Sequence, residues 1–98
     1  MKVQVPLSFD IGHGWRAVQA QTDASSSIAL VKIEKMDRAV MDRVTSWYRN
    51  KPEAHVYVRL DLDKHMLIDR PPVDVDSNVV DGLVEQVVTA EERDNHTH

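Results

Sequence analysis

The sequence HVYVRLDLDKH, residues 55–65, alternates apolar and polar side chains over most of its length. The apolar members occupy even positions: Val56, Val58, Leu60 and Leu62. The polar and aromatic members occupy odd positions: His55, Tyr57, Arg59, Asp61, Asp63 and His65. Successive side chains of a β-strand point to opposite faces of a sheet, so a period of two predicts one buried and one solvated face. We therefore expect residues 55–65 to form a strand whose polar face is either a solvated surface or a working one.

Two further strands are expected at the N-terminus. Residues 2–11 alternate in the same way, with apolar side chains at the odd positions. Pro6 lies on the polar face and has no N–H to donate to a sheet, which favours an edge position for this strand. The sequence Gly-His-Gly at 12–14 predicts a turn, because glycine reaches positive φ without steric cost. Residues 15–21 are then expected to return antiparallel to the first strand.

The remaining strands follow from a similar pattern. A polar loop at 23–27 precedes residues 28–34, which are rich in Ile, Leu and Val and predict a third strand. Residues 66–68 either extend the 55–65 strand or return beside it as a short hairpin arm. The sequence Arg-Pro-Pro at 70–72 ends the sheet, because proline interrupts the hydrogen-bonded ladder.

Two segments change to a helical period. Residues 38–49 place apolar side chains on one stripe, with Asp37 as the predicted N-cap: Val40, Met41, Val44, Trp47 and Tyr48. Residues 76–90 do the same, with Asp76 as the predicted N-cap: Val79, Val80, Leu83, Val84, Val87 and Val88. The valines and a glycine of the second segment are poor helix formers, so its pattern predicts a helix more strongly than its composition does.

The expected order of elements is therefore β-β-β-α-β-(β)-α. It predicts the α+β class, with an antiparallel sheet of four to five strands and two helices packed on one face. Residues 1–92 are expected to form a single domain, followed by a frayed polar tail at 93–98.

Composition restricts the class of protein. The chain has 98 residues, 42% of them hydrophobic and 29% charged, as expected of a small soluble globular domain. It contains no cysteine, which excludes disulfides, thiolate metal sites and a thiol nucleophile. No apolar run approaches the ~20 residues of a membrane span, and the N-terminus lacks the apolar core of a secretion signal. We expect a cytoplasmic protein that does not enter a membrane.

The net charge of −4 is divided unevenly along the chain. Residues 1–60 carry nine Lys and Arg against six Asp and Glu, whereas residues 61–98 carry three against ten. Such an asymmetry either keeps a small domain soluble or marks an acidic surface that meets a basic partner.

Carboxylate and imidazole side chains suggest one possible metal site. Asp61, Asp63 and His65 are expected on the same face of the 55–65 strand, in steps of about 7 Å. Asp10 lies on the polar face of the first strand and could add a third carboxylate. Oxygen-rich sites of this kind suit Mg²⁺ or Mn²⁺.

A local resemblance leads to the same residues. The sequence LSFDIG at 7–12 resembles the first strand of ribonuclease H-like nucleases, including RuvC-type domains, in which an apolar strand ends in Asp-x-Gly. The resemblance implies a metal-dependent phosphodiesterase in which Asp10 is the first metal ligand and Asp61 or Asp63 the second. It also implies a central position for the first strand, in contrast to the edge position that Pro6 favours.

The same strand also suggests a binding surface. Tyr57 and Arg59 are residue types enriched at protein interfaces, and Asp61 and Asp63 would extend that surface. The six apolar residues of the 76–90 segment are more than a small core needs, which makes a homodimer through this helix plausible. Single-stranded nucleic acid could stack on Tyr57 beside Arg59, but a pI near 5.6 and few aromatic residues favour a protein partner.

We expect a small binding or regulatory protein of the accessory or inhibitor type, without a cofactor and without enzymatic activity. Its partner would be another protein, with a basic surface if the acidic half of the chain takes part. The alternatives are a metal-dependent nuclease using Asp10, Asp61 and Asp63, and a single-strand nucleic-acid binder.

Overall fold

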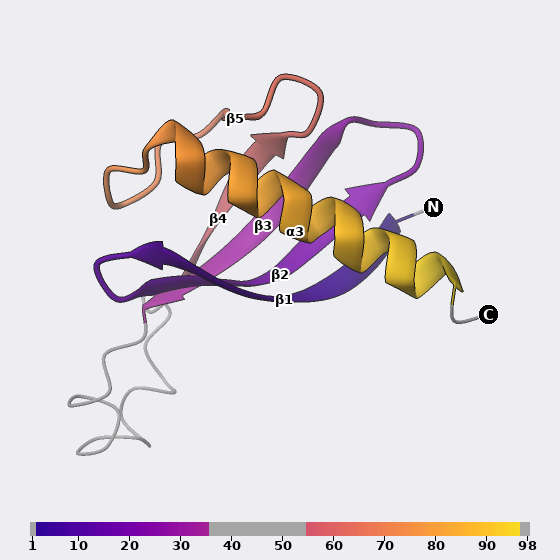
Figure 1. Ribbon diagram of the computed structural model, residues 1–98, viewed down its shortest axis with the longest axis horizontal. Helices are drawn as coiled ribbons and strands as arrows, with labels where there is room; N and C mark the ends of the chain where they lie inside the picture. Colours follow the sequence, from indigo (N-terminus) through magenta and orange to yellow (C-terminus); the bar gives the residue numbers. More distant parts are fainter. Residues whose placement is uncertain (1, 36–54, 97–98) are drawn as a thin grey trace, which may run out of the picture.

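A computed structural model describes residues 2–35 and 55–96 of the chain. Five strands and one helix lie within these residues (Figure 1). In chain order they are β1 (Lys2–Gly12), β2 (Trp15–Asp23), β3 (Ile28–Lys35), β4 (His55–Asp61), β5 (Met66–Leu67) and α3 (Ser77–His96). The helix predicted at 38–49 lies outside the described residues.

The strands form one antiparallel sheet in the order β1-β2-β3-β4-β5, so each strand pairs with the next one along the chain. This arrangement confirms the predicted α+β class and antiparallel sheet. β1 is an edge strand, as Pro6 indicated. The β1–β2 turn uses positive φ at three successive residues, Gly12 (109°), His13 (53°) and Gly14 (83°), which explains the two glycines there.

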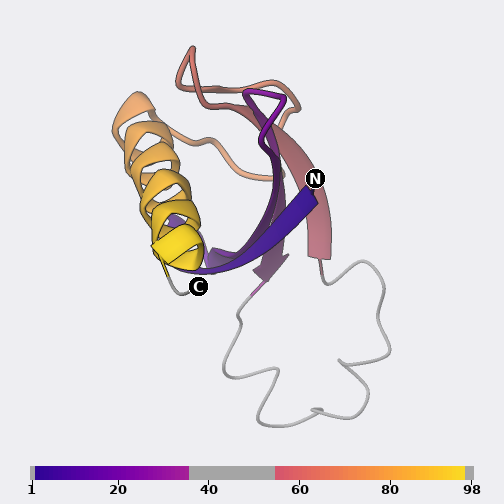
Figure 2. The ribbon, with the colours of Figure 1, turned by 90° about the vertical axis from the view of Figure 1, so that its right-hand side faces the viewer.

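The hydrophobic core lies between the sheet and α3, which covers one side of the curved sheet (Figure 2). Alternate residues of β1, β3 and β4 supply buried side chains, as the period of two predicted. A bulge between Ala17 and Gln19 shifts the phase of β2, and consequently Ala17 and Ala20 both face the core. The largest fully buried side chains come from both layers: Val5, Val31, Ile33, Leu60, Leu83 and Val87.

The helix α3 begins where its sequence predicts. The Oδ1 of Asp76 accepts a hydrogen bond from the backbone N–H of Val79 at 3.0 Å, which is the geometry of an N-cap. The apolar stripe then packs onto the sheet, with Val80, Leu83, Val84 and Val87 buried. α3 continues to His96, past the predicted end at residue 90.

The strand predicted over 55–65 is shorter than expected. β4 ends at Asp61, residues 62–65 form a turn, and β5 returns antiparallel with Leu67 opposite Leu60. The prediction that a single strand continues to His65 was wrong, because the carboxylate of Asp61 stabilises a turn at this point. Of the two possibilities for residues 66–68, the structure shows the hairpin arm.

Candidate functional site

The predicted carboxylate site is divided between opposite corners of the sheet. Asp10 pairs with Arg16, which pairs with Glu34, which in turn pairs with His55 at the start of β4. Asp61 lies six residues further along β4. The two aspartates are therefore separated by three inter-strand spacings across the sheet and by six residues along the strand direction. This separation amounts to more than about 20 Å. Within residues 2–35 and 55–96, no group of three or more His, Asp or Glu side chains could hold a metal ion.

Both carboxylates instead stabilise turns. The Oδ1 of Asp10 accepts the N–H of Gly12 at 2.9 Å. The Oδ1 of Asp61 accepts the N–H groups of Asp63 and Lys64, each at 3.0 Å. Aspartate favours turns for this reason, since its short side chain satisfies backbone donors two or three residues ahead. The two residues that the nuclease resemblance singled out therefore have local structural roles.

The position of β1 also differs from the one that the nuclease resemblance implies. The resemblance at 7–12 implies a central first strand, whereas β1 lies at the edge of the sheet that residues 2–35 and 55–96 form, in which every strand pair is antiparallel. Asp63 and His65 lie in the β4–β5 turn and do not extend a row on β4. The Nδ1 of His65 lies 3.2 Å from the Oδ1 of Asp81, which connects this turn to α3.

The face of the sheet opposite α3 carries Tyr57, as the sequence predicted. We call it the open face, since no described element covers it within residues 2–35 and 55–96. Tyr57 is 51% exposed, and its ring meets the imidazole of His55 edge-on at a centroid distance of 5.7 Å. A hollow of about 200 Å³ lies beside it, lined by Gln4, Gln19, Gln21, Leu30, Lys32 and Tyr57. Its charged member, Lys32, pairs with Glu34 at 3.4 Å.

Arg59, the second predicted binding residue, is held by Asp69. Its Nε and Nη2 donate to the two carboxylate oxygens of Asp69 at 3.1 and 2.8 Å, and its backbone N–H donates to Oδ2 at 3.0 Å. The side-chain hydrogen bonds from Arg59, followed by the backbone one, lower the pKa of Asp69 below its ordinary value. The same contact raises the pKa of Arg59. The guanidinium charge is thus neutralised by a carboxylate, which weakens the case for a phosphate contact here.

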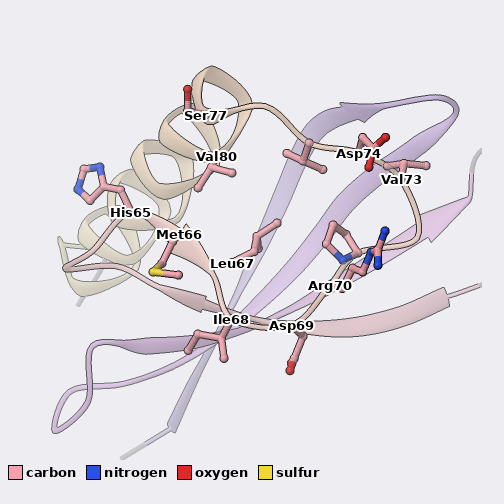
Figure 3. A pocket seen from close by; sticks show the side chains of 12 residues that line it. His65, Met66, Leu67, Ile68, Asp69, Arg70, Val73, Asp74, Ser77 and Val80 are labelled. Carbon is pink, nitrogen blue, oxygen red and sulfur yellow. The ribbon is translucent and has the colours of Figure 1, made fainter.

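A larger hollow lies between β5, the segment that follows it and the first turns of α3 (Figure 3). It has a volume of about 550 Å³ and is called the β5–α3 hollow below. Its apolar lining comes from Met66, Leu67, Ile68, Pro71, Val73, Val75 and Val80, and its polar lining from His65, Asp69, Arg70, Asp74 and Ser77. Figure 3 shows Leu67 and Val80 directed toward the space, whereas the carboxylate of Asp69 points away from it.

Apolar side chains at this hollow are unusually accessible. Met66 is 48% exposed and Ile68 is 41% exposed, whereas Val80 is buried. Sequence reasoning assigned residues 66–68 to a strand extension or a hairpin arm and residues 70–72 to a break, and did not identify a site there. The signal that could have located it is the cluster of apolar residues around Arg-Pro-Pro at 70–72, outside any periodic element.

All residues that line this hollow belong to the acidic half of the chain, residues 61–98. Residues 61–81 carry six aspartates against two cations, Lys64 and Arg70. Three of the aspartates are engaged by the Asp69–Arg59, Asp76–Val79 and Asp81–His65 contacts described above. Asp63 and Asp74 are exposed and accept no side-chain hydrogen bond or ion pair from the described residues. We call residues 61–81 the acidic end of the molecule.

The apolar stripe on which the predicted homodimer depended belongs largely to the core. Val80, Leu83, Val84 and Val87 are buried against the sheet, and Val88 is 39% exposed. Packing within one chain thus accounts for the four buried residues of the stripe.

No family model, no curated protein and no solved structure matches this chain. The described part of the chain contains no helix long and apolar enough to cross a membrane.

Proposed function

We propose that this protein is a small binding module that acts through protein–protein contacts and recognises a basic partner surface with its acidic end. The observation that carries the proposal is the concentration of six aspartates in residues 61–81, beside the exposed apolar side chains of Met66 and Ile68. Opposite charges steer partners together and set their orientation, and exposed apolar side chains supply the contact area.

The division of charge supports a protein partner over nucleic acid. The side of the molecule that carries the β5–α3 hollow is acidic and would repel a phosphate backbone. The hollow on the open face has one charged lining residue, Lys32, and both Lys32 and Arg59 are paired with carboxylates. The positions of Asp10 and Asp61 give no support to the alternative of a metal-dependent nuclease.

Selection from a random peptide library displayed on phage tests this proposal without assuming any particular partner. The immobilised wild-type protein should enrich peptides rich in Lys and Arg, and their binding should weaken as ionic strength rises. Enrichment of acidic or uncharged peptides alone would contradict the proposal.

Two matched variants locate the binding surface. Asp63→Asn combined with Asp74→Asn removes two exposed charges at the acidic end without removing a described turn or cap. Binding of the enriched peptides should weaken by roughly threefold or more, since an exposed ion pair contributes about 0.2–1 kcal/mol. Glu91→Gln combined with Glu92→Gln makes the same charge change in the C-terminal part of α3, about 20 Å from the start of the helix, and should have little effect. Equal losses in the two variants would mean that only total charge matters.

A further inference from the structure

The β5–α3 hollow combines a fixed apolar floor with an adaptable rim. Leu67, Val73 and Val75 are partly buried and pack against the buried core, to which Val80 belongs. Met66 and Ile68, which alternate with Leu67 along the chain, also line the hollow and are 48% and 41% exposed. A floor that belongs to the core is already formed before a partner arrives, and methionine adapts readily to the shape of what it contacts.

We infer that this hollow is an anchor site for one bulky aliphatic side chain, such as leucine, carried by a partner segment in which lysine or arginine flanks that side chain on both sides. This inference rests on the proposed function and specifies the chemistry of the partner. The volume of about 550 Å³ exceeds what one leucine fills, and the excess accommodates the backbone of the segment and the stems of its basic side chains.

Charge determines which apolar segment fits. Asp74 lines the hollow and Asp63 lies in the adjoining turn, and neither carboxylate is engaged by another described side chain. Arg70 is the cation among the lining residues, and Asp69 on the same wall is already paired with Arg59. The surrounding segment retains its excess of aspartates over cations, so a basic segment is attracted and an acidic one is repelled.

The hollow on the open face differs from the β5–α3 hollow in volume and in the chemistry of its lining. It is smaller, at about 200 Å³, and three of its six lining residues are glutamines. The Nε2 of Gln19 donates to the Oε1 of Gln4 at 3.1 Å, so part of its polar lining is internally satisfied. The β5–α3 hollow is therefore the better match, in charge and in apolar lining, for a basic segment with an aliphatic anchor.

A pair of synthetic peptides tests the inference by NMR titration of the full chain. One peptide has a central leucine flanked on both sides by lysines, and the other has alanine in place of that leucine. The leucine peptide should bind about tenfold more tightly, as expected from burying one leucine side chain. The Met66→Gln and Ile68→Thr double variant should remove that preference, whereas Val88→Thr, which changes an exposed apolar residue elsewhere on α3, should retain it.

The outcomes separate this inference from the proposed function. If both peptides bind equally and Asp63→Asn with Asp74→Asn weakens both, the acidic end binds basic segments but the hollow is not an anchor. If neither peptide binds, or if that charge variant changes neither affinity, the proposed function fails together with the inference. A preference for leucine that survives the Met66→Gln and Ile68→Thr variant would also overturn the assignment of the anchor to this hollow.

Discussion

Arg59 binds Asp69 with two side-chain N–H groups and with its own backbone N–H, so one carboxylate holds both the side chain and the main chain of the neighbouring strand. Asp69 lies just beyond β5, which is two residues long. The N–H of Ile68 also donates to the carbonyl of Arg59 at 2.8 Å. These bonds connect the segment that lines the β5–α3 hollow to the sheet.

Acid should loosen this connection. The pKa of Asp69 is lowered in the folded protein by its hydrogen bonds with Arg59, so the stabilisation is fully present above the ordinary value of 3.8 and is lost as pH falls through the lower folded value. The pKa of Asp23 is also lowered, first by the backbone N–H of Ser25 and then by its hydroxyl. Urea unfolding between neutral pH and about pH 2 should therefore show stability falling below about pH 4. In the Asp69→Asn variant the free energy of unfolding should fall less between neutral and acidic pH than in the wild type. An equal fall in the two proteins would contradict this role for Asp69.

Close packing of α3 on β1 should make Gly82 intolerant of a side chain. A Cβ at Gly82 would lie 2.9 Å from the Cζ of Phe9 and 3.2 Å from its Cε2. Alanine improves helix propensity by about 1 kcal/mol, but overpacking costs about 1–3 kcal/mol, so Gly82→Ala should destabilise the protein. In a Phe9→Leu background the same substitution should be neutral or stabilising, with a coupling energy of about 1 kcal/mol. Chemical denaturation of the four proteins of the cycle measures this coupling, and additive effects would exclude the contact.

The β4–β5 turn should depend on Asp61 and not on Asp63. Asp61→Ala removes the acceptor of two backbone N–H groups and should lower the free energy of unfolding by about 1–2 kcal/mol. Asp63→Ala, two residues away on the exposed side of the turn, should change it by less than about 0.5 kcal/mol. Thermal unfolding of the two variants compares these effects directly. Equal losses would show that the turn is held in another way.

Asp10 and Asp61 should not bind a divalent metal ion jointly. Titration with Mg²⁺ or Mn²⁺, followed by NMR, should give no joint saturable response at Asp10 and Asp61, since the register places them at opposite corners of the sheet. Asp10→Asn should alter the neighbouring turn, where its carboxylate accepts the N–H of Gly12, and should leave the signals of Asp61 unchanged. Saturable shifts at both aspartates would restore the nuclease hypothesis.

Much of the fold could be predicted because local patterns and burial agree. Period-two alternation located β1 and β4, the glycines at 12 and 14 marked the first turn, and Asp76 marked the start of α3. Pro6 indicated the edge position of β1. The end of β4 was missed, because alternation continues through Leu62 and Asp63, and only the hydrogen bonds of Asp61 distinguish a turn there from a longer strand.

The candidate site was harder to predict, because its parts are not periodic. Tyr57 lies exposed on the open face as expected, but the partner of Arg59 is Asp69, ten residues away across a short hairpin. The β5–α3 hollow depends on how Met66, Val73 and Ser77 are placed around one space, and no spacing in the sequence specifies that arrangement. The close approach of Gly82 to Phe9 could not be predicted from the sequence. A glycine within a helical pattern lowers the helix propensity, but the pattern does not say whether packing is the reason for it.

The most direct test of the central claim is a chemical-shift map of the isotope-labelled protein with the lysine-flanked leucine peptide. The account predicts that the backbone signals that shift and saturate cluster within residues 63–80, at the β4–β5 turn, β5 and the first turn of α3. Shifts centred on Tyr57, Leu30 and Gln19 of the open face, or the absence of any saturable shift, would contradict it.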